Sequence, residues 1–138
     1  MSDLREALAR AICASCDEIP DFVCAQGVIR SRTAEVLATL GGTNARSCGI
    51  DDDAIVPVNN RLLAWADYIV CMEKLHSDYV KLFCECDPAS VISLGIPDEY
   101  MPFDDELIAL LIGSLHYKLE QVSDAIVAGR DEHKRRMQ

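Results

Sequence analysis

Apolar and polar positions change their spacing in blocks along the chain, and the blocks predict strands and helices in turn. Nearly all of residues 68–72 are apolar, which is typical of a parallel strand covered on both faces. Residues 2–14 instead repeat their apolar side chains at helical spacing. The pattern predicts strands over 19–23, 45–48, 67–72 and 91–94, and helices over 2–14, 31–40, 59–66, 73–84 and 104–127.

This alternation predicts an α/β fold in a single domain, 1–138, with a four-stranded parallel sheet flanked by helices and right-handed crossovers. The two ends of the chain lie outside the alternation. Residues 1–17 are expected to form an extra N-terminal helix that packs on the domain or makes a homodimer contact. Residues 129–138 are expected to be a flexible charged tail.

Composition and charge narrow the function classes. Hydrophobic residues make up 50% of the chain and charged residues 26%, as in globular proteins. The formal net charge of −10 disfavours nucleic acid and acidic membrane surfaces as partners. No apolar run approaches the ~20 residues of a membrane span, and no signal pattern opens the chain. We therefore expect a cytoplasmic protein.

The chain has seven cysteines, an odd number that favours reduced thiols over a disulfide framework. Cys13, Cys16, Cys84 and Cys86 could supply four thiolates to zinc. The first two lie on the predicted N-terminal helix, where cysteine serves as a small apolar residue, so we expect no metal and no cofactor. The acidic run 51–53 lacks the ligand spacing of a calcium loop, and His76 is expected at the surface.

The spacing of Cys24 and Arg30 carries candidate chemistry. Cys24 ends an apolar run, Arg30 follows after five residues, and a helical segment comes next. Five residues can wrap around a tetrahedral oxyanion, with backbone N–H groups inward and the positive end of the helix dipole beside them. Gly27 permits the unusual backbone angles, and Arg30 can hold two phosphate oxygens at once. The same field favours the thiolate of Cys24, so the segment is a candidate phosphate site with a nucleophile.

The spacing alone also fits a buried cysteine at a strand end beside a surface arginine. Residues 24–31, followed by 33–35, resemble more specifically the phosphate loop of the low-molecular-weight protein tyrosine phosphatases. More closely, the sequence looks like a compact branch of that superfamily found in bacteria and phages. It continues in the expected order through 47–49, 65–74 and 96–100, and so covers the chain from Phe22 to the last predicted helix.

The resemblance implies a role for each matching residue. Cys24 matches the nucleophile that forms a phosphocysteine intermediate, Arg30 the phosphate-binding arginine, and Ser31 the serine that supports the thiolate. Asp98 matches the general acid that protonates the leaving phenol and then activates water, although Pro97 and Asp98 also suit an ordinary turn. The phosphate-binding residues implied are Ala25, Gln26, Gly27, Val28, Ile29, Arg30 and Ser31.

The substrate implied is a phosphotyrosine protein or a small aryl phosphate, hydrolysed without metal. Two aromatic residues are candidates for the substrate pocket. Tyr100 follows Asp98 and is expected at the pocket entrance or packed in the core. Trp65 is expected either in the core or stacked on the substrate phenol.

Four positions depart from the family pattern and leave room for other functions. Gly27 replaces the asparagine that usually braces the loop, Ile29 a second loop cysteine, Arg32 a proline, and Glu99 another proline. A catalytically weak module that only binds phosphate would tolerate these changes.

A thiol-coupled arsenate reductase of the same fold is the other alternative. Cys71 at the end of the third strand, with Cys84 or Cys86 beyond it, could relay a disulfide. The spacing does not match that family well, and the residues after the strand look more like those of the phosphatases.

Overall fold

The computed structural model describes residues 20–24, 27 and 29–138. Its strands are β1 (Pro20–Cys24), β2 (Arg46–Gly49), β3 (Tyr68–Cys71) and β4 (Val91–Ser93). Its helices are α2 (Arg30–Leu40), α3 (Asn60–Trp65), α4 (Lys74–Phe83), the short 3₁₀ helix η1 (Pro88–Ser90), α5 (Asp105–Leu115) and α6 (Glu120–Arg136). The strands form one sheet in the order β2-β1-β3-β4 with every pairing parallel, which confirms the predicted fold class. The predicted N-terminal helix lies outside the described residues.

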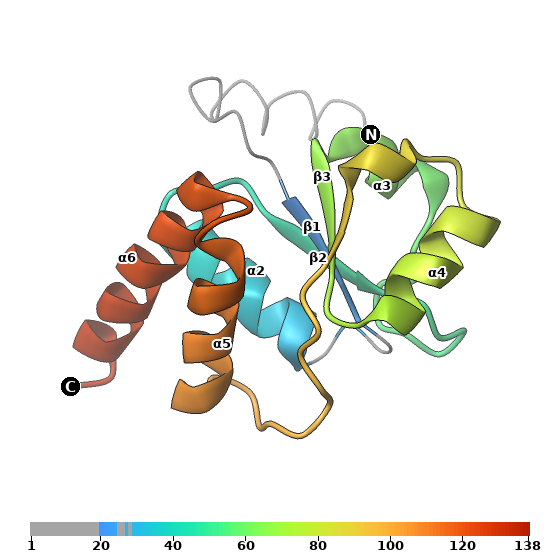
Figure 1. Ribbon diagram of the computed structural model, residues 1–138. Coiled ribbons are helices and arrows are strands. Elements are labelled where there is room, and N and C mark those ends of the chain that lie inside the picture. The colour runs from blue at the N-terminus through green and yellow to red at the C-terminus, as the bar shows by residue number, and fades with distance from the viewer. Residues whose placement is uncertain (1–19, 25–26, 28) are drawn as a thin grey trace.

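Helices cover both faces of the sheet: α2, α5 and α6 lie on one side and α3 and α4 on the other (Figure 1). Alternate residues of β1 therefore enter two different cores. Phe22 packs in the cluster formed with α2, α5 and α6, whereas Val23 packs in the cluster formed with α3 and α4. Pro20 stands at the first position of β1, where a missing ladder donor is tolerated.

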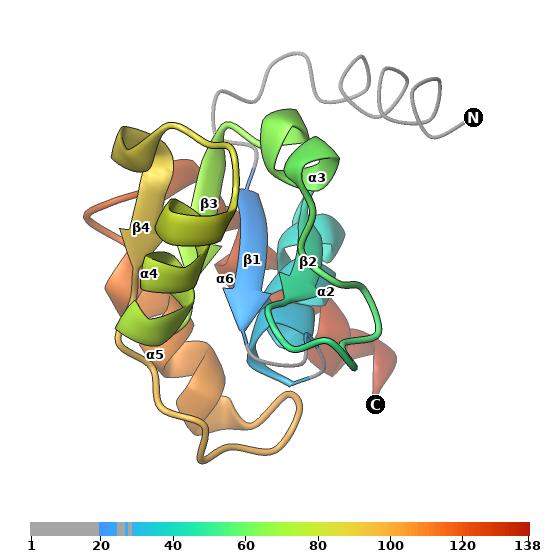
Figure 2. The same ribbon diagram turned by 90° about the vertical axis from the view of Figure 1, so that its right-hand side faces the viewer.

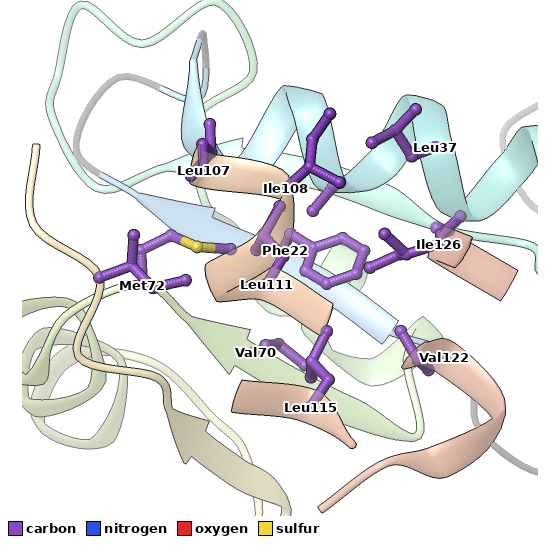
Figure 3. Packing of buried hydrophobic residues seen from close by; sticks show 14 of the residues in the cluster. Phe22, Leu37, Val70, Met72, Leu107, Ile108, Leu111, Leu115, Val122 and Ile126 are labelled. Atoms are coloured by element: carbon purple, nitrogen blue, oxygen red, sulfur yellow. The ribbon is translucent and has the colours of Figure 1, made fainter. Parts of the chain in front are cut away.

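The larger core is built around Phe22, which is fully buried (Figure 3). Its partners in the same cluster come from β3 (Val70), α2 (Leu37), α5 (Leu111) and α6 (Ile126), and in the figure they lie around it. All four of these partners are inaccessible to solvent. This packing holds α2 against β1, the two elements that flank the candidate phosphate loop.

The carboxyl ends of the strands meet at one edge of the sheet, and the segment that joins β4 to α5 runs along this edge (Figure 2). Backbone hydrogen bonds extend the sheet past the strands there. The N–H of Ile50 donates to Cys24 O at 3.0 Å, and the N–H of Ile96 donates to Met72 O at 2.7 Å. Segments distant in sequence are thus brought next to Cys24, at the edge where open α/β sheets bind ligands.

The prediction of a single long helix over 104–127 is wrong. The chain turns after Leu115 and begins α6 at Glu120, and the Ser123 hydroxyl donates back to Ile112 O of α5 at 3.1 Å. Leu115 and Leu119 are both buried and four residues apart, so their spacing continues the helical pattern across the turn. No glycine or proline marks the turn in the sequence.

The segment predicted to be a charged tail belongs mostly to α6, which ends at Arg136. Gly129 is buried against α2, and this contact holds the middle of the helix. Only the last turn is exposed and basic, as suits the negative end of a helix dipole. No helix in the described ranges is long and apolar enough to cross a membrane.

Candidate active site

The candidate site forms around Cys24, the last residue of β1, whose side chain is 4% exposed. Its Sγ atom lies 2.9 Å from the hydroxyl oxygen of Ser31, the second residue of α2. The backbone N–H of Gly27 donates to the same sulfur at 3.1 Å. The Gly27 N–H therefore donates to the sulfur, and the Ser31 hydroxyl, which can act as donor or acceptor, would also donate to it when the sulfur is a thiolate.

Gly27 takes a conformation that other residues rarely adopt. Its φ is +71°, and a Cβ atom added there would lie 2.9 Å from the carbonyl carbon of Cys48. The loop therefore passes directly over the end of β2, where there is no room for a side chain. This close approach gives a physical reason for glycine at the position where the resembling family has asparagine.

Arg30 begins α2 and is 2% exposed. Its Nη1 atom donates to Glu73 Oε2 and to the carbonyl oxygen of Ile96, each at 2.8 Å. Both N–H groups of Nη1 are therefore used by protein acceptors, so a phosphate would be held through Nε and Nη2. Glu73, two residues after the end of β3, is a site residue that sequence reasoning missed, although its place beyond a strand end is a signal that could have identified it.

Asp98 approaches Arg30 from the segment between β4 and α5. Its Oδ1 atom lies 3.9 Å from Arg30 Nε, and its side chain is 65% exposed. Asp98 thus combines a position over the guanidinium with access to solvent. Tyr100 is partly buried and packs against the larger core cluster, and burial with nearby Glu106 raises the pKa of its phenol.

His76 is not at the surface, contrary to the prediction, but fully buried. Its Nδ1 accepts a hydrogen bond from the backbone N–H of Glu73 at 3.0 Å, and its own backbone N–H donates to the Glu73 side chain. This reciprocal pairing, a capping box, starts α4. Desolvation, followed by the charge of Arg30, lowers the pKa of His76.

The substrate-pocket prediction for Trp65 is wrong, while its alternative place in the core is correct. Trp65 is 4% exposed and belongs to the cluster under α3 and α4. The Arg46 guanidinium lies over its ring, 4.6 Å from the centroid. In the register of β1 and β2, Arg46 stands opposite Asp21, near the start of β1. Trp65 therefore lies toward the amino ends of the strands, whereas Cys24 lies at their carboxyl ends.

Ile29 and Ser31 flank Arg30, and the Ile29 carbonyl accepts from Thr33 in the first turn of α2. The other three residues of the predicted phosphate loop, Ala25, Gln26 and Val28, lie outside the described residues. Within the described ranges, no group of three or more His, Cys, Asp or Glu side chains is arranged to hold a metal ion.

The described cysteines are all free thiols. Cys71 is fully buried, and burial raises the pKa of its thiol to about 12. A thiol in this state attacks a disulfide poorly. The structure therefore offers no support for Cys71 as a relay in arsenate reduction.

No family model matches the chain, and no curated protein matches its sequence. Solved structures nevertheless share its fold. One is the tyrosine phosphatase Wzb from Escherichia coli K30 in complex with phosphate, with a TM-score of 0.56 and 16% identity over 86% of this chain and 96% of that chain. Another is a low-molecular-weight protein tyrosine phosphatase from Bacillus subtilis, with a TM-score of 0.53 and 17% identity over 84% of this chain and 99% of that chain.

A third similar structure is a mutant of the arginine phosphatase YwlE with a phosphorylated active-site serine. Its TM-score is 0.51 with 18% identity, and the match covers 87% of this chain and 99% of that chain. At these identities the likeness concerns the backbone. The chain has the fold of the low-molecular-weight protein tyrosine phosphatases.

Proposed function

We propose that this chain is a cysteine-dependent phosphatase that hydrolyses phosphotyrosine or other aryl phosphate monoesters through a phosphocysteine intermediate. The observation that carries the proposal is the pair of hydrogen bonds to Cys24 Sγ, with the Gly27 N–H and the Ser31 hydroxyl, beside the buried Arg30. A structural cysteine at a strand end needs neither hydrogen bond. The fold supports the same conclusion, since the similar structures include tyrosine phosphatases.

In the first step, the Cys24 thiolate attacks phosphorus and forms a P–S bond while the P–O bond to the aryl group breaks. Arg30 holds two of the phosphoryl oxygens and balances their charge. Asp98 gives its proton to the departing phenoxide, a transfer worth ~10²–10⁴-fold in rate. Its exposed carboxyl beside Arg30 suits this role, because the leaving group departs toward solvent.

In the second step, the Asp98 carboxylate takes a proton from water as the water attacks phosphorus. The P–S bond breaks, inorganic phosphate leaves, and the electron pair returns to the sulfur as a thiolate. Ser31 and Gly27 then donate to the sulfur again, which makes it a better leaving group. A free, reduced Cys24 is needed in each cycle, in keeping with our proposal of a cytoplasmic location.

The test is hydrolysis of p-nitrophenyl phosphate in the presence of a chelator, compared among the wild type and single variants. Cys24→Ser is expected to abolish turnover, and Asp98→Asn to reduce kcat by about 10²-fold or more. Glu99→Gln is the matched control, because it neutralises the adjacent exposed carboxylate, and it should retain activity. Full activity of Cys24→Ser would refute the mechanism.

The substrate class needs a second measurement. The name of the YwlE structure adds phosphoarginine to the substrates worth comparing. We expect a phosphotyrosine peptide to be cleaved with a higher kcat/KM than a phosphoarginine peptide of the same sequence. The reverse order would retain the cysteine mechanism and replace the proposed substrate.

A further inference from the structure

The buried His76 has a nitrogen that the capping box does not use. Nδ1 accepts the backbone N–H of Glu73, so in the neutral ring the proton must lie on Nε2. Nε2 lies 3.6 Å from Glu73 Oε2 and has no hydrogen-bond partner within the described part of the chain. A buried N–H is therefore held beside the same carboxylate oxygen that binds Arg30.

Glu73 Oε2 thus lies between two donors, Arg30 Nη1 at 2.8 Å and His76 Nε2 at 3.6 Å. The Glu73 side chain is 37% exposed, so without the His76 ring the carboxylate would keep only Arg30 and the backbone N–H of residue 76 as donors and could tilt toward water. Arg30 is buried and depends on Glu73 and the Ile96 carbonyl for the placement of Nη1. The orientation of the guanidinium consequently depends on where the Glu73 carboxylate is held.

We propose that His76 is a positioning residue that fixes Glu73 and, through it, orients Arg30 toward the phosphate. The inference rests on the proposed function, since it assigns Arg30 to a bound phosphate. Direct contact between His76 and the substrate is not required. The capping box explains Nδ1 alone, whereas this role also explains why Nε2 is buried beside the carboxylate.

The charges facing His76 come from four segments. Arg30 lies at the start of α2, Glu73 before α4, Asp51 between β2 and α3, and Asp98 between β4 and α5. Burial and Arg30 oppose a second proton on the ring, while the three carboxylates favour it. A protonated ring could no longer accept the Glu73 N–H. Only the neutral ring can both accept the Glu73 N–H at Nδ1 and direct an N–H at Nε2 toward the Glu73 carboxylate.

Two substitutions separate the cap from the positioning role. In His76→Asn, the amide oxygen can replace Nδ1 as acceptor for the Glu73 N–H, but nothing replaces Nε2. In His76→Gln, the amide can reach the place of Nε2, but the acceptor at Nδ1 is lost. If His76 positions Glu73, His76→Asn should fold with a Tm near that of the wild type yet lose about 10–100-fold in kcat/KM, the range that a slight misplacement produces.

A double-mutant cycle with Glu73→Gln provides the decisive measurement on the full chain. If His76 acts through Glu73, His76→Asn should have little further effect on kcat/KM for p-nitrophenyl phosphate once Glu73 is Gln. His116→Asn, at an exposed histidine, is the matched control and should leave kcat/KM unchanged. Additive losses in the cycle, or wild-type kinetics in His76→Asn, would overturn the proposal.

Orthovanadate binding by calorimetry separates this inference from the proposed function. If the wild type binds vanadate but hydrolyses nothing, the phosphatase proposal fails. The double-mutant cycle of His76→Asn and Glu73→Gln can then be carried out with vanadate affinity in place of kcat/KM. A weaker, non-additive vanadate affinity in His76→Asn would then support the positioning role. Absence of binding by the wild type would overturn both proposals.

Discussion

Gly129 of α6 touches the backbone of Leu37 in α2. A Cβ atom added to Gly129 would lie 1.8 Å from the Leu37 carbonyl oxygen, far inside any real contact. Gly41 makes a similar approach from the other side, with an added Cβ 1.7 Å from the carbonyl oxygen of Ala125. Two glycines thus let α2 and α6 pack backbone to backbone.

Gly129→Ala should therefore destabilise the protein by about 2–3 kcal/mol, because the two helix backbones must separate to make room. Gly113→Ala is the matched control: Gly113 is an exposed position of α5 with nothing within 4 Å of an added Cβ. That change should stabilise by up to about 1 kcal/mol through helix propensity. Urea unfolding of the two variants should give opposite signs, and equal signs would contradict the packing.

Gly27→Ala should destabilise the chain and weaken phosphate binding. Gly27 and Gly95 both have a φ of +71°, but an added Cβ meets the Cys48 backbone only at Gly27, while Gly95 has nothing within 4 Å. Gly95→Ala should thus show the conformational cost alone, about 1–2 kcal/mol. The excess loss in Gly27→Ala, measured by urea unfolding, reports the steric contact. Equal losses of stability in the two variants would show that the loop moves away from the Cys48 backbone at no cost.

Asp21→Asn should remove a pH dependence of stability. Asp21 is fully buried in β1, and desolvation raises the pKa of its carboxyl to about 8. Since this pKa is raised in the folded state, the stabilising contribution is complete below about pH 4 and is lost as the pH rises to about 8.

In that window the free energy of unfolding of the wild type should fall by about 1.4 kcal/mol per pH unit from this group. Asp21→Asn should flatten the slope, and Asp78→Asn, at an exposed aspartate of α4, should leave it intact. Urea unfolding at pH 5, 7 and 9 makes the comparison. An unchanged slope in Asp21→Asn would show that another group titrates there.

Ser31→Ala should slow alkylation of Cys24. The Ser31 hydroxyl lies 2.9 Å from the sulfur, and a hydrogen bond to a charged group is worth about 1.5–3 kcal/mol. Its loss should slow the reaction of the sulfur with an alkylating reagent about tenfold or more. The measurement is the rate of iodoacetamide labelling at neutral pH, followed on the peptide that contains Cys24. Ser77→Ala, which removes another buried serine, should not alter the rate.

Most elements were predictable because their signals are local. The apolar run at 68–72 became β3, and Gly41 and Gly42 follow the last residue of α2 as expected. The turn between α5 and α6 was not predictable, since Leu111, Leu115 and Leu119 keep a helical spacing through it. What bends the chain is the burial of a second apolar face, with Val122 and Ile126, in the same core.

By itself the sequence determined the order of strands and helices from β1 to α5 and the spacing of Cys24 and Arg30, whereas the candidate acid Asp98 came from the family resemblance. Periodicity and short spacings hold that information because each involves residues close together in the chain. Only the tertiary structure decided that Arg30 meets Glu73, 43 residues away, and Ile96, 66 residues away. The same holds for the burial of His76. These contacts arise where the carboxyl ends of neighbouring parallel strands meet, and which strands become neighbours is set by the packing of the whole chain.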